Sequence, residues 1–339
     1  MKRIIWADAL KGWLMILVII GHAIQSVLGG ICEQTHLWNM IYSFHMPAFI
    51  AVSGYLSYRP DAKMGGGNFV SYVKRRFQQL MIPYFIWSLI LYFNPYRHSP
   101  KVLSDIIFAP AYYFWFLWAL FFICVLFKAS QIIAAKVSKD ELLVILPLCM
   151  VLTGAMVILD LRIFGFQYIS YYMMFYTLGY IIHRFRFFKI RNAYMLILLT
   201  LIWMFMAFNW SMHTLPEWII VPYMPTSLML YVYRTICATL AILVLLNLSA
   251  LSSDKKSEGD NQNQVCSFIT NLGRLSLGVY VVHLTIIFDM PYALSLVSIS
   301  VGGWLGIAII AIMALFISWL IVQVLTKNRF TNRLLLGKV

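Results

Sequence analysis

Apolar runs long enough to cross a lipid bilayer recur along the whole length of this chain. A helix rises about 1.5 Å per residue, so about 20 apolar residues span a hydrocarbon core roughly 30 Å thick. With 62% hydrophobic and 11% charged residues, the composition excludes a soluble globular protein. The pattern predicts an all-α fold, a polytopic transmembrane helical bundle of about ten spans, at residues 10–28, 37–58, 77–93, 110–127, 141–159, 167–182, 193–209, 226–249, 275–296 and 301–326.

The lysines and arginines predict the orientation of these spans, because basic residues concentrate in cytoplasmic loops. With the amino terminus inside, 21 basic residues fall in cytoplasmic segments and only three, Arg97, Lys101 and Arg162, lie outside. Both termini are therefore expected in the cytoplasm. The net charge of +14 is explained by this topology and by anionic lipid headgroups, so no nucleic-acid partner is expected. We expect one integral-membrane domain over residues 1–339, with a flexible cytoplasmic loop at 250–274.

The first span carries ionisable side chains at places where such groups are costly and usually functional. Lys11 and His22 are 11 positions apart, about three helical turns, so they share one face of the helix. On the second span, His45 precedes Met46 and Pro47, at a depth similar to that of His22. The structural alternatives are a lysine that extends to the headgroups and histidines that bond to a neighbouring helix.

Further polar residues lie in or beside other spans. Arg234 lies about two turns inside the eighth span, and Tyr280 and His283 share one face of the ninth. Arg75 and Arg76 lie at the cytoplasmic end of the third span. They either follow the positive-inside rule or also bind the phosphates of a nucleotide-bearing donor. The five cysteines show no C-x-x-C spacing, so no metal site is indicated.

Several of these motifs carry a family resemblance that covers essentially the whole chain. The segment from Asp8 to His22 is similar to the opening signature of the membrane-bound acyltransferase family 3, with Lys11 where arginine is commoner. The segment Phe44 to Gly54 resembles the second-span pattern of the family, in the form found in its sugar O-acetylase branch. Weaker matches follow in order, at Lys74 to Tyr84, Trp115 to Leu117 and Leu277 to Leu284.

The resemblance implies an integral-membrane O-acyltransferase in the cell membrane, expected to be the bacterial plasma membrane. It would move an acyl group, acetyl by expectation, from cytosolic acyl-CoA to a hydroxyl of a sugar or cell-surface glycan. No bound cofactor is expected, and acetyl-CoA or another acyl-CoA would be a co-substrate. The expected catalytic residues are His22 and His45, and the substrate-binding ones are Lys11, Arg75, Arg76, Arg234, Tyr280 and His283.

His22 is the expected base or a transient acyl carrier, since a histidine with a pKa near 6.5 is neutral at pH 7. The sequence leaves open whether transfer is direct or passes through an acyl-histidine. A glycan or small-molecule transporter is the alternative function, because intramembrane ionisable residues also mark transport pathways. A purely structural membrane component is the third.

Overall fold

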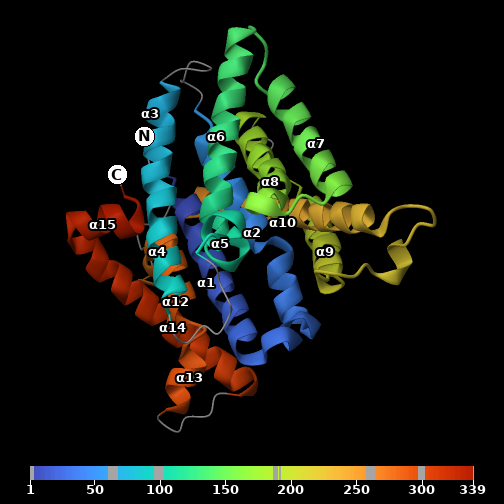
Figure 1. Cartoon of the computed structure of the whole chain (residues 1–339). Coiled ribbons are helices and arrows are strands. Elements are labelled where there is room, and N and C mark those ends of the chain that lie inside the picture. The colour runs from blue at the N-terminus through green and yellow to red at the C-terminus, as the bar shows by residue number, and fades with distance from the viewer. Residues whose placement is uncertain are drawn as a thin grey trace. The chain divides into compact units, whose positions relative to one another are not determined.

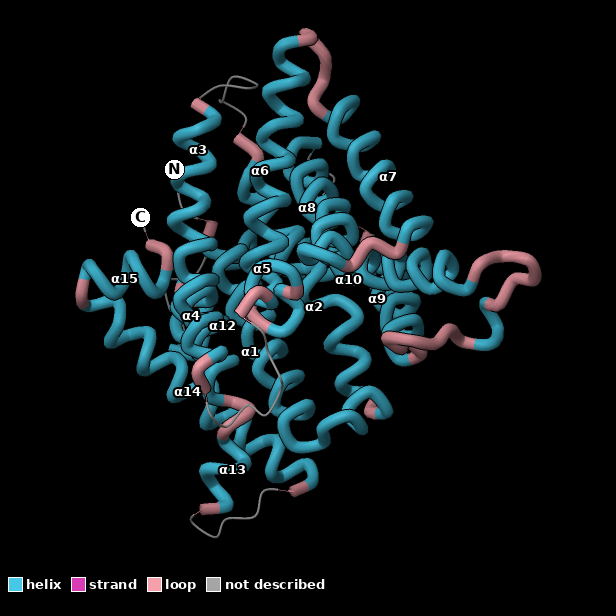
Figure 2. Tube along the Cα trace, viewed as in Figure 1, coloured by secondary structure: helices cyan, strands magenta, loops and turns pink. Residues whose placement is uncertain are grey.

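A computed structural model describes residues 4–59, 68–94, 103–185, 190, 192–256, 264–296 and 302–338. Within these ranges all regular structure is helical and no strand is found, which confirms the all-α prediction (Figure 2). Five helices of the described part are long and apolar enough to cross a membrane. They are α1 (Ile5–Leu28, with the short helix after it), α6 (Trp115–Lys136), α7 (Leu142–Leu159), α10 (Thr226–Lys256, counted to Leu251) and α14 (Gly303–Lys327).

Helices also lie at the other five predicted spans. The second, sixth and seventh spans correspond to α2 (His36–Ser57), α8 (Phe166–Phe185) and α9 (Ala193–Phe208). The third corresponds to a rod in which α3 (Phe69–Arg76) and α4 (Ile82–Tyr92) are joined by a π-helical segment, Phe77–Met81 (Figure 1). The ninth is divided between α12 (Ser276–Ile286) and α13 (Met290–Ser295).

The chain forms two compact units. Unit 1 consists of residues 1–52 and 185–320, and unit 2 of residues 53–184 and 321–339. Unit 1 therefore holds α1, most of α2, and α9 to α13, together with most of α14. Unit 2 holds the α3 and α4 rod, α6, α7, nearly all of α8, the short α5 (Asp105–Phe108) and α15 (Arg329–Leu336).

In unit 1, a helix that the sequence did not predict packs along α1. Residues 264–274 were expected inside a flexible loop, but they form α11 (Gln264–Arg274), while residues 257–263 lie outside the described part. The helix buries Ile269 and Leu272, three residues apart on one face. Two glycines allow the close approach. A Cβ on Gly12 would overlap the carbonyl of Ile269, and one on Gly273 would overlap the carbonyl of Asp8.

The break between α12 and α13 has a local cause. Pro291 has no N–H to offer to the carbonyl of Ile287, four residues earlier. That carbonyl instead accepts a hydrogen bond of 2.9 Å from Ser26 Oγ of α1. The break therefore ties the end of α12 to the first helix, beside His22.

Unit 2 is held by close helix packing and by a polar network. Gly54 lies against Tyr176, where a Cβ would overlap the backbone carbonyl, so this end of α2 approaches α8 closely. At the end of α8, Arg184 forms ion pairs with Asp140 and with the buried Glu141, which precede α7. The interactions fix the ends of α7 and α8 to each other.

Candidate active site

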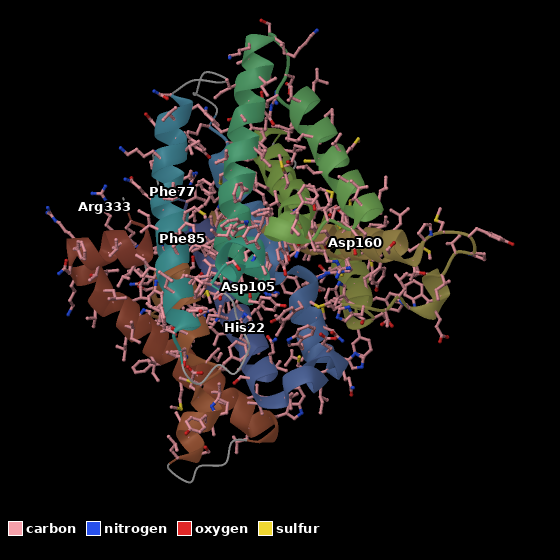
Figure 3. The ribbon with its side chains drawn as sticks, viewed as in Figure 1. His22, Phe77, Phe85, Asp105, Asp160 and Arg333 are labelled. Atoms are coloured by element: carbon pink, nitrogen blue, oxygen red, sulfur yellow. The ribbon has the colours of Figure 1, made fainter. Side chains whose placement is uncertain are left out.

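The candidate active site of unit 1 begins with His22 in the carboxyl-terminal half of α1 (Figure 3). The Nδ1 atom of His22 lies 3.2 Å from Oε1 of Gln25, one turn further along the helix. The same amide oxygen accepts a hydrogen bond of 3.4 Å from the hydroxyl of Tyr42 on α2. Gly21 makes room for this ring, because the ideal Cβ position lies 2.9 Å from a ring carbon of Tyr42. Gln25 thus connects His22 to the second helix.

Tyr42 also lies between the two histidines expected to be catalytic. Its ring centroid is 6.4 Å from that of His22 and 4.8 Å from that of His45. His45 is buried, and its Nδ1 lies 2.7 Å from the carbonyl oxygen of Ile41, one turn earlier. A carbonyl only accepts hydrogen bonds, so Nδ1 of His45 carries the proton and Nε2 keeps its lone pair.

The third imidazole, His283 of α12, lies nearest to His22. The two ring centroids are 5.4 Å apart, and the rings are inclined by 42°. His283 is completely buried, and its Nδ1 lies 3.0 Å from the carbonyl oxygen of Val279. The ring centroid of Tyr280 lies 5.8 Å from that of His283. The ring of Phe288, in the turn between α12 and α13, lies 5.8 Å from that of His22. Three imidazoles from three helices therefore meet in one part of the unit.

Lys11 lies on the same helix as His22 and is held by an acid. Its Nζ is 2.8 Å from Oδ1 of Asp8, which is only 5% exposed. The close contact of Gly273 with the Asp8 carbonyl places this pair where α1 and α11 cross.

The remaining predicted residues are Arg234 in unit 1 and Arg75 and Arg76 in unit 2. In unit 1, the guanidinium of Arg234 lies 5.3 Å from the ring of Trp210, in a cation–π contact. In unit 2, Arg75 is exposed. The guanidinium of Arg76 is bonded to neighbours on its own helical rod, Tyr72 at 3.4 Å and Gln79 at 3.2 Å. No substrate role follows from these contacts alone.

Sequence reasoning missed two members of the site, Gln25 and Tyr42. Each was detectable in principle, because Gln25 follows His22 by three positions and Tyr42 precedes His45 by three. Residues three apart lie on the same helical face. A polar residue three positions from a buried histidine therefore indicates a candidate hydrogen-bond partner. Aromatic and amide residues are common in this chain, so many of them lie at this spacing by chance.

The fold and this cluster define a helical membrane protein with basic ring nitrogens gathered between its helices. Comparison with known proteins is more specific. Residues 4–323 match the family model described as "Acyltransferase domain", of acyltransferase family 3. The chain belongs to this acyltransferase family.

Two relatives have the printed name nodulation protein NolL. The protein from Mesorhizobium japonicum is 32% identical over 130 residues, which cover 36% of this chain and 34% of the relative. The protein from Sinorhizobium fredii is 31% identical over 156 residues, 42% of each chain. The chain thus spans well under half the length of these relatives. No solved structure matches it.

Proposed function

We propose that this protein is an O-acyltransferase of the bacterial plasma membrane. It transfers an acyl group, acetyl as the first choice, from cytosolic acyl-CoA to a hydroxyl of a sugar in a cell-surface glycan. The observation that carries the proposal is the meeting of His22, His45 and His283 in a chain of an acyltransferase family. Attack on a thioester needs a group that removes the hydroxyl proton, and neutral imidazole is suited to this task near pH 7.

In this proposal His22 either removes the proton or carries the acyl group for a time. His45 orients the acceptor through its Nε2 lone pair, and Tyr280 and His283 complete the substrate site. Lys11 binds a phosphate of the donor, and Arg75 and Arg76 are the candidates of unit 2 for the same task. Arg234 stabilises the oxyanion that forms on the thioester carbonyl, since charge acts strongly where water is excluded.

The test uses the purified full-length protein in lipid vesicles. The substrates are radiolabelled acetyl-CoA and surface polysaccharide from the producing cells, stripped of esters by mild alkali. We expect labelled polysaccharide and an equal amount of free CoA thiol. General base catalysis contributes roughly 100 to 10,000-fold, so His22→Ala should reduce transfer by at least that lower factor.

The matched control is His183→Gln in unit 2. The Nδ1 of His183 also bonds a backbone carbonyl, that of Tyr55 at 2.7 Å, but His183 belongs to unit 2 and has no part in the proposed reaction. The His183→Gln variant should transfer acyl groups at the wild-type rate. Full activity of His22→Ala would contradict the proposed role of His22. Movement of polysaccharide across the vesicle membrane without any acylation would favour a transporter instead.

A further inference from the structure

The tautomer of His283 is fixed by its surroundings. Its Nδ1 faces the carbonyl oxygen of Val279 at 3.0 Å, so Nδ1 must be the protonated nitrogen. Nε2 therefore carries a lone pair. This atom is buried and has no hydrogen-bond partner among the residues that the structure describes. A buried acceptor without a partner is unfavourable, and a ligand that donates a hydrogen bond would satisfy it.

His22 has the same tautomer for a different reason. Its Nδ1 lies 3.2 Å from Gln25 Oε1, and this oxygen also accepts from the Tyr42 hydroxyl. An amide oxygen cannot donate, so Nδ1 of His22 is protonated and Nε2 keeps its lone pair. Two neighbouring imidazoles thus each present a basic nitrogen, and two lone pairs cannot bond to each other.

The two rings are close neighbours, with centroids 5.4 Å apart, so both can face one bound substrate. A hydroxyl has one proton and donates it to one Nε2 only. The two histidines differ in access. His22 is partly exposed, whereas His283 is fully buried. The more accessible ring is the better placed to meet an incoming thioester, and the buried ring to hold a hydroxyl.

The following inference rests on the proposed function and assigns two roles within it. We infer that His283 is a second catalytic histidine, whose Nε2 takes the proton of the acceptor hydroxyl, while His22 carries the acyl group. If His283 served only to pack α12 against its neighbours, its bond to Val279 would be explained, but its buried Nε2 would have no hydrogen-bond partner. If His283 is a base next to the acyl carrier, Nδ1 bonds Val279 and Nε2 receives the proton of the hydroxyl.

The chemistry runs in two balanced steps. Nε2 of His22 forms a bond to the thioester carbonyl carbon, the carbon–sulfur bond breaks, and CoA leaves as the thiolate. Nδ1 of His22 keeps its proton, bonded to Gln25. The hydroxyl oxygen then attacks the acyl carbon, its proton passes to Nε2 of His283, and the carbon–nitrogen bond breaks with its electron pair returning to His22. His283 then gives its proton to water and the released thiolate takes a proton from water, so the products are an ester and a thiol.

The experiment compares His283→Gln and His283→Asn with His22→Ala and the control His183→Gln. Gln places an amide oxygen near the Nε2 position, where it accepts a hydrogen bond but is too weak a base to hold the proton. Asn keeps a donor near the Nδ1 position for Val279. Acetyl-CoA is mixed with each full-length protein in vesicles, with and without the stripped polysaccharide. Free thiol, labelled polysaccharide and thermal unfolding are measured.

We expect both His283 variants to release about one CoA per protein in a rapid burst and then to transfer at least 100-fold more slowly than the wild type. His22→Ala should show neither burst nor transfer, and His183→Gln should behave as the wild type. Two variants are used because His283→Gln does not keep the hydrogen bond to Val279. If His283→Gln unfolds for that reason, His283→Asn, which keeps a donor for Val279, still tests the inference.

Three other results would overturn the inference. Transfer by folded His283 variants within threefold of the wild type would show that another group takes the proton. Loss of transfer without a CoA burst, in folded variants, would show direct transfer from the thioester and no acyl-His22. A wild-type protein that neither releases CoA nor labels the polysaccharide would overturn the proposed function itself, a failure recognisable without any variant.

Discussion

At the scale of single residues, the pairing of Lys11 with Asp8 shows how a charge is kept at one end of α1. A buried carboxylate is costly unless it is paired, and Lys11 supplies the partner at 2.8 Å. The lysine side chain is itself about one-fifth exposed, so it is accessible to a second anion. A phosphate of the donor is the anion that the proposed reaction provides.

Replacing Lys11 tests this role. Lys11→Ala should raise KM for acyl-CoA by roughly 10 to 100-fold with little change in kcat, because a hydrogen bond to a charged group contributes about 1.5–3 kcal/mol. Lys11→Arg keeps the charge and should stay within about threefold of the wild type. Steady-state kinetics with varied acyl-CoA give both numbers.

Loss of Lys11 also leaves Asp8 without its ion pair, and this could lower stability and mimic a binding defect. The double variant Lys11→Ala/Asp8→Asn removes the charge as well. KM should remain raised in the double variant while its unfolding temperature returns toward that of the wild type. A normal KM in the double variant would assign the effect of Lys11 to folding and not to the donor.

At the scale of helices, the sequence predicts regular elements well and their interruptions poorly. Long apolar runs gave the position of a helix at all ten predicted spans, since burial in lipid demands hydrogen-bonded backbone. The helix α11 was missed because Ile269 and Leu272 follow a strongly polar segment, and their partner surface lies on α1, more than 250 residues earlier. The break at Pro291 was missed because both halves of the span are apolar.

The same reasoning separates the parts of the site. The face shared by Lys11 and His22 follows from helical periodicity within one element. The meeting of His22 with His283 depends on the packing of α1 against α12, which no local pattern encodes. The family motifs include both His22 and His283, so they indicated that both segments matter. They did not indicate that the two segments are in contact.

The contact of α11 with α1 gives a prediction for an element. Gly273→Ala would force α11 away from Asp8 and Lys11, because the added Cβ overlaps the Asp8 carbonyl. Overpacking of this kind costs about 1–3 kcal/mol. We expect a lower unfolding temperature and a raised KM for acyl-CoA, measured by thermal unfolding and kinetics.

Gly154→Ala is the matched control for that substitution. Gly154 lies inside α7, and its added Cβ meets no atom within 4 Å. Alanine is favoured over glycine in a helix interior by about 1 kcal/mol, so this variant should be as stable as the wild type or slightly more stable. Equal behaviour of the two alanine variants would show that the contact of Gly273 has no influence on the donor site.

At the scale of the whole molecule, chemistry between a cytosolic donor and an outer acceptor requires a defined orientation in the membrane. The proposed topology has ten spans with both termini in the cytoplasm, and it rests on the distribution of basic residues. Five helices of the described part meet the criteria of length and apolarity on their own. Of the others, α2 with His45 and α8 with its many tyrosines carry polar groups that lower their hydropathy, whereas α9 and α12 are apolar but shorter.

Labelling of single cysteines tests this topology. Four of the five native cysteines are buried and the fifth is partly exposed, so a variant without them is the starting point. A cysteine at His213, in an exposed loop expected outside, should react with a membrane-impermeant maleimide in intact cells. Cysteines at Lys139 and Lys338 should react only after the cells are permeabilised, because the basic segments around them are expected in the cytoplasm. Labelling of Lys338→Cys in intact cells would require an odd number of spans or a reversed chain, and in a reversed chain acyl-CoA would reach α1 from the wrong side.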